Sequence, residues 1–129
     1  MVGKRKVCRR RHLITNPFDE ANKSLFDTAE LIELKTGELE QAREKYLFAE
    51  AAYEHVYSRF LLATKIKEPD MVQSEIIAQA KMLSYESKLE MIKTESTYRR
   101  LQNEVKSLRD RLDVWKEVSY NLRRDRVQG

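Results

Sequence analysis

The chain is poor in the residues that make turns, because its 129 positions include only 3 glycines and 2 prolines. An average protein contains roughly 7% glycine and 5% proline. Folds that need many tight corners, such as β-sandwiches and barrels, are therefore disfavoured. The length fits a single domain.

Cysteine and long apolar runs are also scarce. The one cysteine, Cys8, excludes a disulfide framework within the chain and favours a reducing, cytoplasmic setting. No apolar stretch approaches the roughly 18 residues of a membrane-spanning helix, so we expect no membrane contact. The basic start runs through Leu13 and Ile14 into Thr15, without the hydrophobic region of a secretory signal.

The groups that catalytic and metal sites need are too few. Cys8 and His12 have the spacing of two metal ligands on a helix, but His55 is the one remaining histidine. A zinc site takes three or four such ligands. The glycines stand apart from one another, so the sequence contains no phosphate-binding loop. We therefore expect no enzyme activity, no metal and no cofactor.

Charge is what the chain has in abundance, since 36% of it is Asp, Glu, Lys or Arg. The hydrophobic share of 41% and the mean hydropathy of −0.69 are too polar for a compact enzyme core. Long solvated helices fit this composition, because each helix buries one narrow seam and exposes the rest. The sequence thus predicts an all-α fold.

The net charge of +4 is unevenly distributed. Residues 1–12 carry six bases and no acid, residues 13–87 carry eight bases and 14 acids, and residues 88–129 carry 11 bases and seven acids. A basic segment such as 1–12 attracts polyanions, above all nucleic acids, by releasing counterions. A solubilising tail and a contact with an acidic partner are the alternatives.

Helix signals divide the chain. Asn16-Pro17 followed by Asp19-Glu20 predicts a helix start, because acids favour the first turn. We expect residues 1–17 to form a basic flexible tail and residues 18–129 a single helical domain for oligomerisation and DNA binding.

Further signals lie inside that domain. Asp27 with Glu30 resembles a capping box that would start a helix. Thr36-Gly37 is either a break or a weak spot in a longer helix. Pro69 ends a helix, and Asp70, with Gln73 three residues on, starts the next one as its cap.

Two heptad runs of apolar residues follow the helical period. The first consists of Leu39, Ala42, Tyr46, Ala49, Tyr53, Val56, Phe60 and Ala63. The second consists of Met91, Thr94, Tyr98, Leu101, Val105, Leu108, Leu112, Trp115, Ser119 and Leu122. Neither run contains a charged residue, which is typical of coiled-coil-like seams. The short connection between them predicts a helical hairpin.

An isolated two-helix hairpin leaves much of each apolar stripe in water. Leu47, Phe48, Leu61, Leu62, Val114 and Val118 flank the seams and widen the stripes. Another copy of the chain is the simplest cover, so we expect a homo-oligomer. The residues expected to hold it together are Tyr53, Phe60, Leu101, Val105, Leu108, Leu112 and Trp115.

Basic residues gather at both ends of the chain. The candidate DNA contacts are Lys4, Arg5, Lys6, Arg9, Arg10, Arg11, Arg123, Arg124 and Arg126. The terminal arginines also suit the negative end of a helix dipole. Between them, Arg99, Arg100, Lys106, Arg109, Arg111 and Lys116 stud the second seam helix. These bases either contact phosphates or pair with acids three or four residues away, such as Glu104, Asp110 and Asp113.

The aromatic residues fall into two groups. Seam positions place Tyr46, Tyr53, Tyr98 and Trp115 in the core. Tyr57, Tyr85 and Tyr120 lie off the seam and are freer to stack on bases.

Three short stretches resemble the phage recombination mediators of the UvsY type over roughly residues 40–128. Tyr57–Leu61 is similar to the family's Lys-Ala-Arg-Leu segment, with Arg59 on its arginine and Tyr57 replacing its lysine. Leu83–Leu89 with Thr94–Tyr98 resembles a Leu-Ser-Ala-Asp-Lys…Thr-Ser-Leu-Gln-Tyr stretch. Leu112–Lys116 and the trailing arginines resemble the family's Leu-Asp-x-Ile-Lys close.

The resemblance implies a ring-forming protein that binds single-stranded DNA and acts in DNA recombination and repair. Its partners would be a recombinase and a single-strand-binding protein, in the cytoplasm of an infected bacterial host. It also implies a DNA contact for Arg59, for which an ion pair with Glu54 or Glu68 is the alternative. The second functional hypothesis is a structural or adaptor coiled-coil subunit, of a virion or a complex, whose basic tail binds nucleic acid or an acidic partner.

Overall fold

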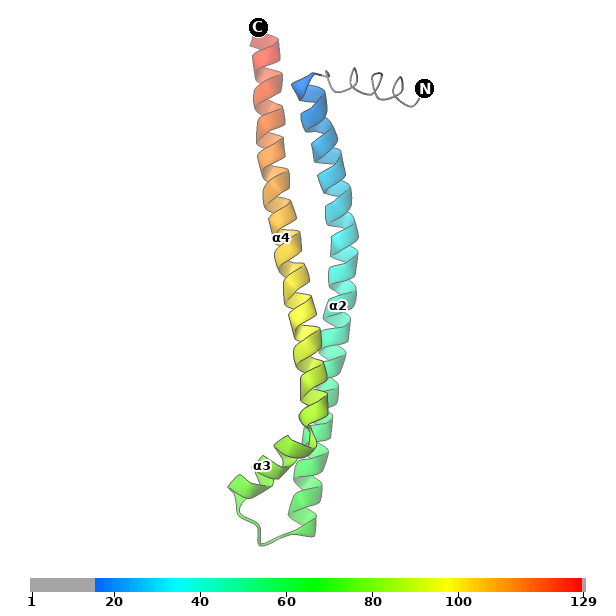
Figure 1. Cartoon of the computed structure of the whole chain (residues 1–129), viewed down its shortest axis with the longest axis vertical. Coiled ribbons are helices and arrows are strands. Elements are labelled where there is room, and N and C mark those ends of the chain that lie inside the picture. Colours follow the sequence, from blue (N-terminus) through cyan, green and yellow to red (C-terminus); the bar gives the residue numbers. More distant parts are fainter. Residues whose placement is uncertain (1–15, 129) are drawn as a thin grey trace, which may run out of the picture. The chain divides into compact units, whose positions relative to one another are not determined.

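The computed structural model describes residues 16–128, of which 94% are helical. The helices are α2 (Pro17–Lys67), α3 (Gln73–Leu83) and α4 (Tyr85–Gln128), as Figure 1 shows. These residues contain no strand. The predicted all-α fold is confirmed.

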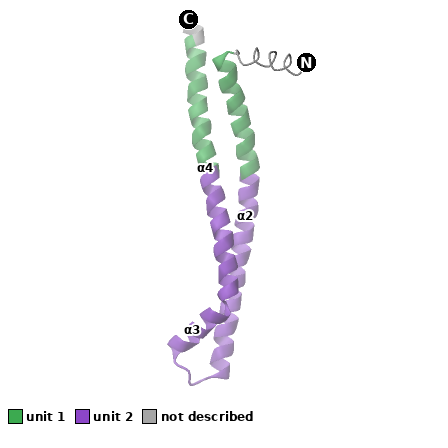
Figure 2. Ribbon diagram, in the orientation of Figure 1, with its two compact units in different colours: residues 1–35, 105–129 green, residues 36–104 purple. Residues whose placement is uncertain are grey.

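The chain divides into two compact units (Figure 2). Among the described residues, unit 1 joins residues 16–35 to residues 105–128, and unit 2 is residues 36–104. Within each unit a segment of α2 lies beside a segment of α4, and α3 belongs to unit 2. The predicted helical hairpin is therefore present.

Helix α2 begins where the sequence indicates. The backbone N–H of Phe18 donates to Asn16 Oδ1 at 3.0 Å, and Asp19 and Glu20 occupy the first turn. The helix then continues without a break through Asp27 and Gly37. The helix start expected at Asp27 is wrong, because the helix already has its cap eleven residues earlier.

The turn after α2 follows the proline signal. Helix α2 ends at Lys67, and the N–H of Met71 donates to the Glu68 carbonyl at 3.2 Å across Pro69. The N-cap of α3 is Val72, whose side chain makes no capping hydrogen bond. The expected start at Asp70 is therefore wrong by two residues, and the carboxylate does not cap the helix.

Ser84 separates α3 from α4 without glycine or proline. Its N–H and its Oγ both donate to the Ala80 carbonyl, at 3.0 and 2.7 Å. Its own carbonyl accepts from the N–H of Lys88 at 3.1 Å. One buried residue thus closes one helix and opens the next.

The cores are narrow and made of small residues. Unit 1 buries Ala21, Thr28, Val105 and Leu108, and unit 2 buries Ala42, Ala49, Thr64, Ile76, Ala80, Ser84 and Leu101. Most of the surface of α2 and α4 outside these buried residues is therefore exposed to solvent. The expected tail lies outside the described residues, apart from Asn16 and Pro17.

Candidate nucleic-acid interface

The bases of α4 differ along the helix. In unit 2, Arg99 Nη2 lies 2.8 Å from Glu95 Oε1, and Arg100 Nη1 lies 3.0 Å from Glu104 Oε1. Both pairs have the i,i+4 spacing that favours ion pairs on a helix. These two arginines are thus engaged within the chain, as the pairing alternative predicted.

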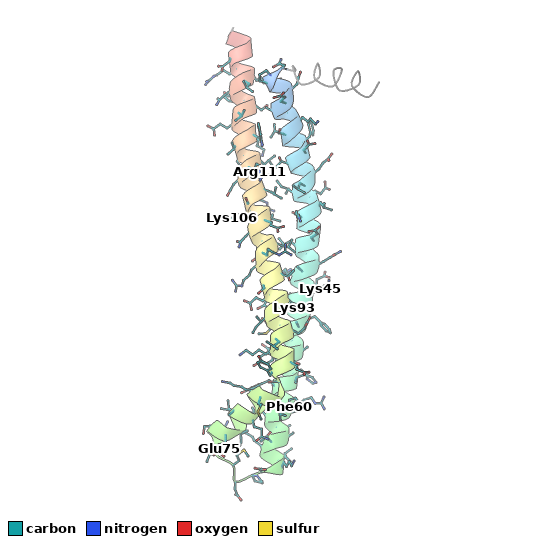
Figure 3. All side chains as sticks on the ribbon, in the orientation of Figure 1. Lys45, Phe60, Glu75, Lys93, Lys106 and Arg111 are labelled. Atoms are coloured by element: carbon teal, nitrogen blue, oxygen red, sulfur yellow. The ribbon has the colours of Figure 1, made fainter. Side chains whose placement is uncertain are left out.

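In unit 1, four exposed bases lie along one side of α4. We call them the basic row: Lys106, Arg109, Lys116 and Arg123. Their spacings of three, seven and seven residues keep them on one helix side, with about 10 Å between heptad neighbours. No base of the row forms an ion pair or hydrogen bond with another residue that the structure describes. Figure 3 labels Lys106.

An aromatic residue lies in the same row. Tyr120 is four residues after Lys116 and three before Arg123, and 66% of its surface is exposed. The other off-seam tyrosines differ, since Tyr85 is exposed in unit 2, whereas Tyr57 packs 6.1 Å from the ring of Tyr53. Basic side chains with an exposed ring between them can bind a single strand in two ways. The charges hold the phosphates, and the ring stacks on the nucleobases.

The two helix segments of unit 1 carry opposite charge. Residues 16–35 hold two bases and five acids, whereas residues 105–128 hold seven bases and four acids. A hydrogen bond of 2.9 Å from Ser119 Oγ to Asn22 Oδ1 links the segments, and Val105 and Leu108 are buried. The positive charge is thus concentrated on α4.

The arginines near the end of α4 that the sequence predicts to contact DNA lie where the basic row ends. Arg123 and Arg124 are exposed on α4, and Arg124 Nε is 4.0 Å from Asp125 Oδ1. The side chain of Arg126 lies outside the described residues, as do the six basic residues between Lys4 and Arg11. Their roles as DNA contacts stay predictions.

Arg59 lies on α2 in unit 2. It is exposed and lines a hollow of about 220 Å³ with Val56, Phe60 and Ala63. It forms no ion pair with Glu54 or with any other described residue. The structural alternative for this arginine is therefore not realised, and its DNA contact stays a prediction.

The residues expected at an oligomer interface lie in or beside the cores of the chain itself. Leu101, Val105 and Leu108 are only 5%, 2% and 7% exposed. Tyr53, Phe60, Leu112 and Trp115 are half-buried. Contact with another copy therefore needs further surface, and the oligomer itself stays a prediction.

Sequence reasoning named Lys106, Arg109 and Lys116 without separating them from the arginines bound in ion pairs. The signal that could have separated them is the heptad spacing from Arg109 to Lys116 to Arg123, together with Tyr120. Asp113 shares this side of the helix.

The described residues offer neither a metal site nor a membrane-spanning helix. They contain no group of three or more His, Cys, Asp or Glu residues placed to hold a metal ion. No helix in residues 16–128 is long and apolar enough to cross a membrane. Comparison with protein-family models, curated proteins and solved structures finds no match to this chain.

Proposed function

We propose that the protein binds single-stranded DNA and acts as a recombination mediator, without catalytic turnover. The observation that supports strand binding best is the basic row of α4. Its four cations have no partner among the described residues, and Tyr120 lies between the last two. Cations with no partner attract phosphates at little internal cost, because no ion pair has to be broken.

The mediator role is supported by the resemblance of residues 40–128 to the UvsY type. In this proposal the protein is a homo-oligomer that presents several basic rows and tails to one strand. Individually weak contacts then add through their effective concentration. Such an assembly would hold a strand for a recombinase while a single-strand-binding protein is displaced, in the cytoplasm of an infected bacterial host.

The test of strand binding is a fluorescence titration of a labelled single strand at several salt concentrations. The first variant replaces the whole row: Lys106→Gln, Arg109→Gln, Lys116→Gln and Arg123→Gln. Each lost phosphate contact lowers the slope of log K against log salt by about 0.7. We therefore expect the slope to fall by about 3 units.

The matched control removes four exposed bases from unit 2: Lys65→Gln, Lys67→Gln, Arg99→Gln and Arg100→Gln. It changes the net charge of the protein equally, so the slope should change much less if the row makes the contacts. A wild-type plot that is flat with salt would contradict strand binding and favour the adaptor alternative. A tight preference for one duplex sequence would also contradict it.

The test of the mediator step is recombinase loading onto a strand covered by single-strand-binding protein. We expect the wild type to increase the loading rate and the row variant to do so much less. An unchanged rate with the wild type would leave a strand-binding protein that is not a mediator.

A further inference from the structure

Unit 2 has two unlike sides between α2 and α4. On one side, large rings fill the space: Tyr46 stacks on Tyr98 with centroids 5.8 Å apart, and Lys88 Nζ lies 5.9 Å from the ring centroid of Tyr53. A groove of about 520 Å³ is formed by the same two helices. Ala49 lines this groove, and its small side chain leaves the space unfilled.

The groove is hollow because small side chains line it from both helices. Ala49 and Ala52 come from α2, and Ser87 and Thr94 come from α4. Thr94 Oγ1 donates to the Met91 carbonyl at 2.9 Å, so its polar group is already satisfied. The lining therefore offers apolar contact to an incoming side chain. A second hollow of about 150 Å³ shares Lys45, Glu90 and Thr94 with it.

A large apolar side chain stands at the rim of the same groove. Phe48 lines it, yet 78% of the residue is exposed. Leu47, beside it in the sequence, is also exposed. The same surface therefore carries both a knob and a hole, and burial of an exposed phenylalanine favours association.

The charged residues around the groove are balanced in sign. Glu44 and Lys45 from α2 and Glu90 from α4 line the groove, and Lys93 of α4 lines the second hollow beside it. None of the four side chains forms an ion pair with another described residue. Figure 3 labels Lys45 and Lys93 on the two helices. The groove and the second hollow together thus have a rim of two acids and two bases. Such a rim attracts neither a polyanion nor a strongly acidic peptide, but it is complementary to a second rim like itself.

We propose that this groove takes the same segment of a second copy of the chain, with each Phe48 entering the groove of the other. A two-fold contact requires one patch to complement itself, and a knob beside a hole inside a balanced rim meets that requirement. The inference rests on the homo-oligomer of the proposed function and assigns it a surface. The residues of the heptad cores then hold the hairpin, and the groove holds the copies together.

The first test compares two exposed phenylalanines. Phe48→Glu removes the knob and places a charge at the contact, whereas Phe26→Glu makes the same change in unit 1 at a residue 72% exposed. Light scattering at tens of micromolar protein measures the mass, and circular dichroism measures the helix content. We expect Phe48→Glu to lower the mass to that of smaller species, and Phe26→Glu to leave it as in the wild type.

The second test fills the hole and keeps the knob. Ala52→Trp places a large ring in the groove of its own chain, so Phe48 of another copy can no longer enter. We expect the same loss of mass, with unchanged helix content, because Ala52 is only half-buried. The third test, Lys45→Glu with Lys93→Glu, makes the rim wholly acidic. It should dissociate the copies at low salt and allow their association at high salt.

Three results would overturn the inference. They are a wild type that is monomeric at these concentrations, an unchanged mass in both Phe48→Glu and Ala52→Trp, or an equal loss of mass in Phe26→Glu. Strand binding is measured on the same samples at low protein concentration. A wild type that binds no strand but loses mass with Phe48→Glu would refute the proposed function and keep the groove. A wild type that binds strands, together with an unchanged mass in every variant, would refute the groove contact and keep the proposed strand binding.

Discussion

In unit 2 Arg99 and Arg100 of α4 are bound to carboxylates, whereas in unit 1 the four bases of the basic row on the same helix have no partner among the described residues. The two units also differ in how their side chains pack. Unit 2 has stacked tyrosines on one side and a groove on the other, while unit 1 buries Val105 and Leu108. This difference is the basis for proposing strand binding in unit 1 and self-association in unit 2.

The largest expected effect comes from charges placed in the core of unit 1. Val105→Glu with Leu108→Lys buries two charges that can pair only with each other, and we expect a loss of more than about 4 kcal/mol in stability. Thermal unfolding followed by circular dichroism measures it, with Asn103→Glu and Ser107→Lys as the exposed control. A variant with unchanged melting but reduced mass would mean that these residues contact another copy instead.

Deletion of residues 1–12 tests whether unit 1 binds strands alone. It removes six of the 25 bases, so we expect the salt slope to fall by up to about 4 units, with helix content and mass unchanged. The titration described for the basic row measures this slope. Unchanged binding would make the segment a partner or localisation element, and binding in unit 1 would then rest on the basic row.

The aromatic residue of the basic row gives a smaller effect. We expect Tyr120→Ala to weaken single-strand binding by about 1–3 kcal/mol, because a base loses its stacking partner. Tyr85→Ala is the control, since Tyr85 is also exposed but lies in unit 2. The comparison between the units fails if both substitutions weaken binding equally, or if duplex binding falls as much as single-strand binding.

Arg59 is the one candidate strand contact in unit 2 among the residues the structure describes. Arg59→Ala in the protein that lacks residues 1–12 should weaken strand binding by roughly the 1.5–3 kcal/mol of a charge-assisted hydrogen bond, or less. Melting temperature should stay constant, because Arg59 has no ion pair to lose within the described chain. Unchanged binding would remove Arg59 from the site and leave strand binding to unit 1.

The smallest effect concerns the tyrosine side of unit 2. The hydrogen bond of 2.8 Å from Tyr46 Oη to Glu50 raises the pKa of this phenol above its usual 10.0, with a further rise from desolvation. A raised pKa stabilises the folded protein at pH values below the usual pKa of the phenol. This stabilisation is lost as the pH rises through the pKa of the folded state. In an absorbance titration of phenolate, Tyr46→Phe should remove the tyrosine that ionises late. Loss of an early one would contradict the assignment.

The sequence predicts the ends of α2 well but its interior poorly. Asn16-Pro17 and Pro69 act locally, so their effects are visible without tertiary contacts. Asp27 has the spacing of a capping box, but the same residue types are acceptable inside a helix once it has started. The break at Ser84 was not predicted, because no glycine or proline marks it in the sequence. The hydrogen bond from Ser84 Oγ to the Ala80 carbonyl is seen only in the folded chain.

The candidate site was predictable in composition rather than in arrangement. The i,i+4 rule predicts the pair of Arg100 with Glu104 from spacing alone. The same rule allows Arg109 to pair with Asp113, and the structure shows no such pair. The groove beside Phe48 could not be predicted either, because heptad positions do not say which side of a seam large rings will fill.

Gly37 lies two residues beyond the boundary between the units, inside a helix that does not break there. A methyl group at this position would meet no atom within 4 Å, so packing does not require glycine. Glycine costs a helix roughly 1 kcal/mol relative to alanine. Gly37 therefore weakens α2 close to the sequence boundary between the units, and amide hydrogen exchange would detect a local opening of the helix there. If the proposed assembly is held together through unit 2, an opening of α2 at Gly37 would weaken unit 1 without separating the copies.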